Sequence, residues 1–198
     1  MNRLAKSCLA AATLALATVA AHADGDIARG AKLAYTCLGC HGIENYKNAY
    51  PKYSVPKLGG QHQAYIVAAL SEYKSGARWH PTMRGLATTL TDQDRADLAA
   101  YFSVTAKVTS AEPVGTPPEQ ATACVACHGK TGVGTMDEYP NLAGQHADYI
   151  AQVLNDYRLG KRKNPLMQPF AQQLSADDIR ALARYFSAQK GLVTQKHD

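Results

Sequence analysis

The sequence is poor in charged residues and has no clustered basic stripe, and each shortage excludes a class of protein. Charged side chains make up 19% of the 198 residues and hydrophobic ones 46%, a balance that excludes a disordered tail or a collagen-like repeat. The net charge of +5 is mild and evenly spread, whereas nucleic-acid binding usually shows as basic residues gathered on one face. We therefore expect one or two globular domains and no nucleic-acid partner.

An apolar segment long enough to cross a bilayer is also missing. Arg3 and Lys6 precede an apolar run over residues 8–20, which ends in small residues up to Ala23. This run is shorter than the roughly 20 residues that span a membrane, so a retained anchor is the less favoured interpretation. The pattern predicts that residues 1–23 are a signal peptide that is cleaved on export.

The sequence repeats itself at an offset of 84 residues. Residues 56–62 align with residues 140–146, and the match continues for about forty residues. Between the two copies, residues 104–117 are rich in Thr, Ser, Val and Pro and lack helical periodicity, which is typical of an extended linker. We therefore expect two domains, over residues 24–103 and 118–198.

Both copies show helical periodicity, and neither shows sustained strand alternation. An apolar stripe that starts at Tyr65 recurs from Tyr149 with the same spacing. Thr91 and Ser175 are candidate N-caps of the last helix in each copy, because an aspartate follows each of them three residues later. The predicted fold class is all-α.

Each copy contains one Cys-x-x-Cys-His motif, the attachment signature of c-type haem. The residues of the two motifs are Cys37, Cys40 and His41, and Cys124, Cys127 and His128. Cysteines three residues apart lie on one face of a helical turn, so both sulfurs can bond the two vinyl groups of one porphyrin. The adjacent histidine then presents its imidazole to the iron. The sequence predicts two covalently attached haem c groups.

The same cysteines are compatible with a redox-active dithiol, a zinc site or ordinary disulfides. A dithiol does not require the histidine, and a zinc site would need the two pairs to converge although they lie 87 residues apart in separate repeats. Two disulfides would leave unexplained why a histidine follows the cysteines both times. Haem attachment is therefore the favoured interpretation.

The sixth ligand of each iron separates an electron carrier from a catalyst. Met83 and Met167 occupy matched positions of the repeat, 42 and 39 residues after His41 and His128. Met136 has no counterpart and is expected at the surface. The sequence predicts that Met83 and Met167 are axial iron ligands.

Two histidines compete with these methionines. His62 and His146 also match between the repeats, but each starts an amphipathic helix after a Gly-Gln pair, where capping or exposure is the commoner role. His80 aligns with Asn164 and so is not repeated. We expect none of these three histidines to bind iron.

The twin haem motifs, the paired Pro-x-Leu-x-Gly-Gln segments and the matched Met and Tyr-Phe positions together resemble the cytochrome c4 family of diheme class I cytochromes c. The resemblance covers nearly all of the chain after residue 23. It implies a tandem duplication of two class I cytochrome c domains, each wrapped around one haem and related by an approximate twofold axis. It also implies that the mature protein resides in the bacterial periplasm.

The resemblance implies roles for three further positions. The carbonyl oxygens of Pro56 and Pro140 are expected to accept a hydrogen bond from the iron-binding imidazole. Gly30 is expected to let the first helix cross the last one closely. The second copy has Pro117 at the equivalent place, so its opening helix should be shorter.

Two arginines stay open to more than one interpretation. Arg78 and Arg162 are matched and stand five residues before each methionine. They either pair with haem propionates, whose planar carboxylates suit a guanidinium, or are solvated surface charges. Lys161, Arg162 and Lys163 form a basic cluster that the first copy lacks, which either docks an acidic partner or is a hydrated loop.

An iron held by His and Met has no open position for a substrate, and thioether ligation raises its potential above that of bis-His haem. We expect an electron carrier, not an enzyme, that passes single electrons between respiratory partners. The resemblance points to a terminal oxidase as acceptor and to a quinol-oxidising complex or a soluble donor upstream, with loose membrane association left open. A diheme subunit of a sulfide-oxidising flavocytochrome and a diheme peroxidase are the alternatives, and the two matched methionines argue against the peroxidase.

Overall fold

The structure is a computed structural model that describes residues 24–196. The predicted signal peptide, residues 1–23, lies outside the described residues. Within the described part, no helix is long and apolar enough to cross a membrane.

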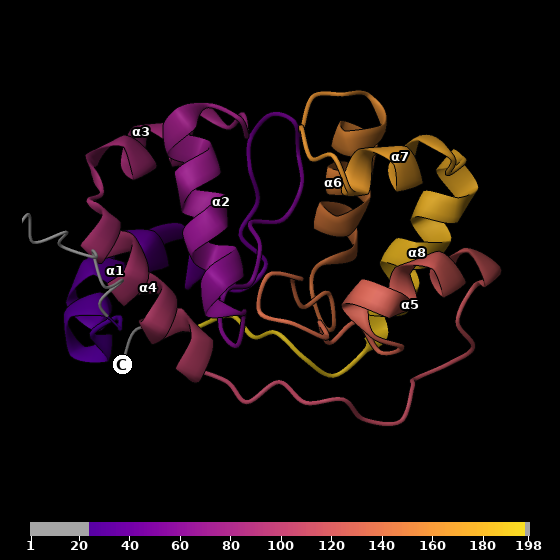
Figure 1. Cartoon of the computed structure of the whole chain (residues 1–198), viewed down its shortest axis with the longest axis horizontal. Coiled ribbons are helices and arrows are strands. Elements are labelled where there is room, and N and C mark those ends of the chain that lie inside the picture. Colours follow the sequence, from indigo (N-terminus) through magenta and orange to yellow (C-terminus); the bar gives the residue numbers. More distant parts are fainter. Residues whose placement is uncertain (1–23, 197–198) are drawn as a thin grey trace, which may run out of the picture.

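The described residues form helices and isolated bridges but no strand, which confirms the all-α prediction (Figure 1). The helices of the first domain are α1 (Ile27–His41), α2 (Gln63–Ser75), α3 (Pro81–Thr89) and α4 (Asp92–Val104). Those of the second domain are η1 (Glu119–Ala121), α5 (Thr122–His128), α6 (Ala147–Arg158), α7 (Met167–Gln172) and α8 (Ala176–Ala188). Residues 105–118 contain no helix.

The last helix of each domain begins with a capping box, as the sequence predicts. The hydroxyl of Thr91 accepts a hydrogen bond from the backbone N–H of Asp94, whose carboxylate accepts one from the backbone N–H of Thr91. Ser175 and Asp178 repeat this arrangement at the start of α8. Each box satisfies backbone donors that a helix N-terminus leaves free.

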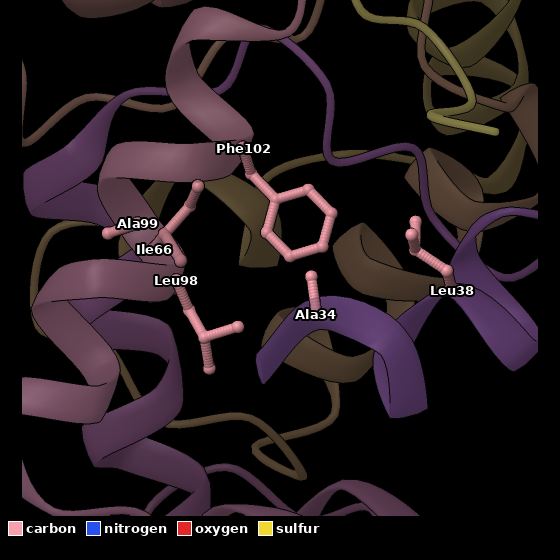
Figure 2. Packing of buried hydrophobic residues seen from close by; sticks show 6 residues of the cluster. All are labelled: Ala34, Leu38, Ile66, Leu98, Ala99 and Phe102. Carbon is pink, nitrogen blue, oxygen red and sulfur yellow. The ribbon is translucent and has the colours of Figure 1, made fainter. Parts of the chain in front are cut away.

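The core of the first domain lies where α1 packs against α4. Ala34 and Leu38 of α1 are buried with Leu98 and Phe102 of α4, and Figure 2 shows the Phe102 ring reaching toward α1. Ile66 of α2 completes the cluster from a third helix. A separate cluster in the second domain forms where α6 meets α8. Each domain therefore has a core of its own.

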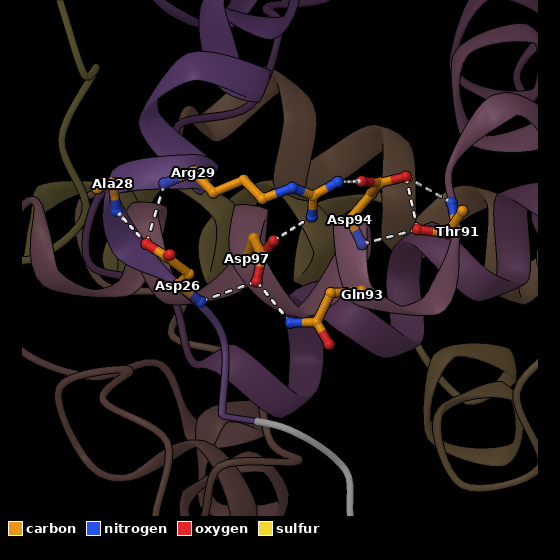
Figure 3. Close-up of polar contacts among 7 residues, drawn as sticks. All are labelled: Asp26, Ala28, Arg29, Thr91, Gln93, Asp94 and Asp97. Carbon is orange, nitrogen blue, oxygen red and sulfur yellow. Dashed lines mark hydrogen bonds and ion pairs between the residues drawn. The ribbon is translucent and has the colours of Figure 1, made fainter.

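The crossing of α1 and α4 depends on Gly30, as expected. A Cβ atom at this position would collide with the carbonyl group of Asp97 in α4. A polar network beside the crossing fixes α1 further (Figure 3). Asp26 caps α1 by accepting hydrogen bonds from two backbone N–H groups, and Arg29 forms ion pairs with Asp94 and Asp97.

The second domain opens differently, which confirms the expected shortening. The short 3-10 helix η1 and the seven-residue α5 stand in the place of the 15-residue α1. The linker partly compensates, because the backbone N–H and C=O groups of Val114 both bond the side-chain amide of Gln189, each at 2.9 Å.

The two domains lie side by side and meet through reciprocal contacts (Figure 1). The Gln61 side chain bonds the backbone N–H and C=O groups of Asn141 at 2.8 and 3.0 Å. Gln145 bonds those of Lys57 at 3.0 Å each. Gln145 stands 84 residues after Gln61, and Asn141 stands 84 residues after Lys57, so the same contact is made twice with the roles of the domains exchanged. Such reciprocity is the mark of a twofold interface.

Candidate haem sites

Both Cys-x-x-Cys-His motifs lie at the carboxyl end of a helix. Cys37, Cys40 and His41 occupy the end of α1, and the second motif closes α5. The helical spacing places the cysteines of each pair on one face, as the attachment of a single porphyrin requires. The four described cysteines form no disulfide, and each is partly exposed.

The histidine of each motif is buried and oriented by a proline carbonyl, as expected. His41 Nδ1 lies 2.7 Å from the carbonyl oxygen of Pro56, and His128 Nδ1 lies 2.9 Å from that of Pro140. With Nδ1–H as the donor, the Nε2 atom is left with its lone pair free to bind a metal. Burial lowers the pKa of both imidazoles and so favours their neutral, metal-binding form.

Met83 and Met167 lie at the start of equivalent helices. Met83 is in the first turn of α3, Met167 is the first residue of α7, and both are half-buried. His80 Nδ1 accepts a hydrogen bond from the backbone N–H of Met83 at 3.3 Å, and Asn164 Oδ1 accepts one from that of Met167 at 2.9 Å. His80 and Asn164 differ in residue type, but each accepts a hydrogen bond from the backbone N–H of the methionine. The comparison of the two repeats missed this shared role.

Of the two competing histidines, His62 is engaged elsewhere. His62 and His146 precede α2 and α6, and neither side chain caps its helix. The His62 Nδ1 atom contacts the carbonyl oxygens of Met136 and Tyr139 in the other domain, at 3.0 Å each. His62 therefore helps to join the domains. Met136 itself is 51% exposed, as expected for a surface residue.

Arg78 and Arg162 are buried, each with 6% of its surface exposed. The interpretation of these arginines as solvated surface charges is therefore wrong. The basic cluster is also smaller than the sequence suggests, because only Lys161 and Lys163 lie exposed around the buried Arg162. Their burial is compatible with the propionate interpretation, which stays a prediction.

No other metal site competes with the two motifs in the described part of the chain. Within residues 24–196, no three His, Cys, Asp or Glu side chains are placed to hold a metal ion together. The two cysteine pairs stay on separate helices, α1 and α5. The zinc interpretation, which needs the pairs to converge, thus gains no support.

Two helical Cys-x-x-Cys-His turns in tandem all-α domains, each with its imidazole held by a proline carbonyl, define a diheme c-type cytochrome. Family models agree with this class. Residues 27–105 match the model "Cytochrome c", and residues 120–186 match "Cytochrome C oxidase, cbb3-type, subunit III". The chain therefore carries two covalent haem c groups, one in each domain.

Similar proteins define the family. A cytochrome c4 of Pseudomonas aeruginosa is 40% identical, and the match covers 93% of this chain and 98% of that protein. The crystal structure of reduced recombinant cytochrome c4 from Pseudomonas stutzeri superposes with a TM-score of 0.68 at 31% identity, covering 83% and 99% of the two chains. A "thiosulfate dehydrogenase electron acceptor" of Stutzerimonas stutzeri is 34% identical over 78% of this chain and 79% of its own length. The chain belongs to the cytochrome c4 family of diheme electron carriers.

Proposed function

We propose that this cytochrome carries single electrons in the periplasm between respiratory partners, toward a terminal oxidase. A quinol-oxidising complex or a soluble redox protein would act as its donor. We further propose that the mature chain begins after the signal peptide of residues 1–23 and comprises domains over residues 24–103 and 118–198, joined by the linker 104–117.

The observation that supports the proposal is that each domain contains a buried motif histidine and, at a matched position of the repeat, a half-buried methionine. Within each motif, the two cysteines (Cys37 and Cys40, or Cys124 and Cys127) would bond one haem. His41 and Met83 would bind the first iron, and His128 and Met167 the second. Because both axial positions would be filled by protein side chains, neither iron would have a free position for a substrate.

The haem supplies the one-electron chemistry, and the chain controls it. Pro56 and Pro140 fix the tautomer and the orientation of the two imidazoles through their carbonyl oxygens. His80 and Asn164 fix the backbone of each methionine. These contacts hold the proposed ligands in place whichever way the electron moves, which favours fast transfer without rearrangement.

The proposed ligands are tested by three single substitutions. Met83→Ala and Met167→Ala should each remove one half of the Met-to-iron charge-transfer absorption of the oxidised protein, while the half-exposed Met136→Ala should leave all of it. Each ligand variant should also lower the potential of one haem, because it loses the thioether that favours the ferrous state. Full absorption in both ligand variants would refute the assignment.

The place in respiration is tested with isolated partners. The reduced protein should be oxidised by a membrane fraction that contains a terminal oxidase, and it should be purified from the periplasm without flavin. Rapid peroxide turnover or a tightly bound flavoprotein would contradict the carrier proposal in favour of the peroxidase or the flavocytochrome subunit.

A second donor has an observation in its favour. The similarity to the thiosulfate dehydrogenase electron acceptor of Stutzerimonas stutzeri suggests that a thiosulfate-oxidising enzyme could reduce this protein. Reduction by thiosulfate in the presence of a thiosulfate dehydrogenase, but not in its absence, is the expected result for this donor. If a quinol-oxidising complex reduces the protein and a thiosulfate dehydrogenase with thiosulfate does not, the second donor is excluded.

A further inference from the structure

The two proposed methionine ligands are held by different side chains. Asn164 Oδ1 accepts hydrogen bonds from the backbone N–H groups of Leu166 and Met167, at 3.0 and 2.9 Å. In the first domain, His80 Nδ1 accepts one from the backbone N–H of Met83, at 3.3 Å. An amide side chain carries a permanent acceptor oxygen, whereas a histidine ring accepts only at a nitrogen without a proton. The bond to Met83 therefore depends on which nitrogen of His80 is protonated.

Asn48 selects the nitrogen that is protonated. Because the backbone N–H of Met83 faces Nδ1, the proton of the neutral His80 ring must lie on Nε2. That atom lies 3.2 Å from Asn48 Oδ1, which can accept its hydrogen. The amide of Asn48 is oriented for this bond, since its Nδ2 atom faces the carbonyl oxygen of Tyr53 at 3.5 Å. Asn48, His80 and the backbone of Met83 thus form one chain of hydrogen bonds.

Asn48 lies in a loop that the second domain has in a shorter form. Residues 42–55 lead from the first motif histidine to its proline, and residues 129–139 do so in the second domain. The longer loop contains a turn that a bridge between Lys47 and Ser54 closes. Inside this bridge, the backbone N–H of Asn48 donates to a carbonyl oxygen of the turn at 2.9 Å. The first domain therefore uses its longer loop to present Asn48.

The second domain holds this turn in place. Asp148 Oδ2 accepts hydrogen bonds from Lys47 Nζ at 2.7 Å and from the backbone N–H and the hydroxyl of Ser54 at 3.1 and 2.9 Å. Ala64 stands at the equivalent position of the first copy, so this contact is made in one direction only. A side chain on a backbone that is already fixed loses little further freedom when it forms a hydrogen bond. The turn is therefore a firm support for Asn48.

We propose that Asn48 and His80 are positioning residues for Met83. Asn48 keeps the proton of the His80 ring on Nε2, and Nδ1 then holds the backbone of Met83, whose side chain would bind the iron. This role rests on the proposed binding of iron by Met83. In the second domain, Asn164 achieves the same with a single side chain, so the loss of Asn48 should act on the first haem alone.

The loss of Asn48 should make Met83 easier to displace from the iron. The His80 ring is then free to carry its proton on Nδ1, which cannot accept a hydrogen bond from the backbone. One hydrogen bond between neutral groups changes an equilibrium constant by about fivefold. Added imidazole, which competes with the methionine for the ferric iron, measures this change. NMR signals of the two bound methionines, assigned with Met83→Ala and Met167→Ala, report the two haems separately.

Titration of the oxidised diheme protein with imidazole is the test. Asn48→Ala should raise the affinity of the first haem for imidazole about fivefold and leave that of the second haem unchanged. Lys52→Gln, at an exposed position of the same turn, is the control and should change neither affinity by more than about twofold. Equal affinities in Asn48→Ala and the wild type, or equal changes at both haems, would overturn the proposal.

The second domain suggests a rescue that separates positioning from a merely structural role. His80→Asn supplies the amide acceptor that Asn164 provides, so it should keep the imidazole affinity of the wild type, whereas His80→Ala should raise it about fivefold. In the His80→Asn background, Asn48→Ala should change the affinity by less than about twofold, because no tautomer is left to select. A fivefold change in that background would show that Asn48 only shapes the loop. That result, or equal imidazole affinities of His80→Asn and His80→Ala, would overturn the proposal.

Failure of this role can be told from failure of the proposed function. If Met83→Ala leaves both methionine signals in place, Met83 is not an iron ligand, and the ligand set and the positioning role are both wrong. If Met83→Ala removes one signal but Asn48→Ala leaves the imidazole affinity unchanged, only the positioning role is refuted. The proposed electron carrier then stands.

Discussion

The two domains share a repeat, yet they secure their first helix by different means. The first domain uses a 15-residue α1 that crosses α4 at Gly30 and is tied by Arg29 to two aspartates. The second domain has only η1 and α5 there, and its linker bonds Gln189 instead. The bond between each motif histidine and a proline carbonyl is nevertheless present in both. The scaffold around a haem site can therefore change while the contacts that orient the proposed iron ligand stay the same.

The largest difference between the domains is expected at the helix crossing. Gly30→Val should lower the free energy of unfolding by about 3 kcal/mol, because its side chain would collide with the Asp97 carbonyl and force α1 away from α4. Pro117→Val, at the equivalent and exposed position of the second copy, should change it by less than about 0.5 kcal/mol. Thermal unfolding of the holoprotein followed by circular dichroism measures both, and equal losses would show that the crossing is not special to the first domain.

The next largest difference between the domains is expected in the dependence of their stability on acid pH. Hydrogen bonds from Thr91, together with Arg29, lower the pKa of Asp94 to about 2. Burial raises the pKa of Asp97, but hydrogen bonds from Asp26, Gln93 and Arg29 outweigh it and leave that pKa lowered. Since an unfolded aspartate titrates near about 3.9, this stabilisation is complete above about pH 4 and is lost as the pH falls toward the folded pKa values.

Asp97→Asn tests the origin of this acid sensitivity. The amide keeps the shape of the side chain but not its charge, so the variant should lose about 2 kcal/mol at pH 7 and show a flatter dependence of stability between about pH 4 and 2. Thermal melts across this range check it. A variant whose stability falls with acid as steeply as that of the wild type would rule out the Arg29 network as the source.

Equivalent substitutions on the two sides of the domain boundary should lower the stability by the same amount. Gln61→Ala and Gln145→Ala each remove two hydrogen bonds to the backbone of the other domain, and each should lower stability by about 2 kcal/mol. The expected near-equality follows from the twofold relation of the contacts. If the melting temperatures of the two variants differ by several degrees, the two contacts are not equivalent in energy.

The capping boxes should give the smallest and most symmetrical effects. Thr91→Ala and Ser175→Ala should each cost about 1 kcal/mol, since both remove the side-chain acceptor of an N-cap. Chemical denaturation of the two variants measures the difference. A loss confined to one domain would show that the two boxes are not equivalent in energy.

Much of the fold could be predicted from residues that lie only a few positions apart in the sequence. The capping boxes at Thr91 and Ser175 depend on residues three positions apart, so the sequence alone places both helix starts. The helical haem-attachment turns follow in the same way from the i, i+3 spacing of their cysteines. The short opening of the second domain was also predictable, because a proline stands where the first copy has Gly30.

Contacts between distant segments could not be predicted in this way. The repeat shows that Arg78 and Arg162 are equivalent, but only the three-dimensional structure shows that they face each other in a buried boundary. Likewise, the comparison of His80 with Asn164 finds two different residues, although both side chains can accept the same backbone hydrogen bond. An alignment of the two copies matches residue types, whereas the structure shows which side chains make the same hydrogen bond.

The central claim is that each domain holds one haem by its own cysteine pair. The mass of the exported protein, made with a working haem-attachment apparatus and measured under denaturing conditions, tests it most directly. The expected mass is that of residues 24–198 plus two haems. A mass that corresponds to the polypeptide alone, or to the polypeptide with one haem, would contradict it.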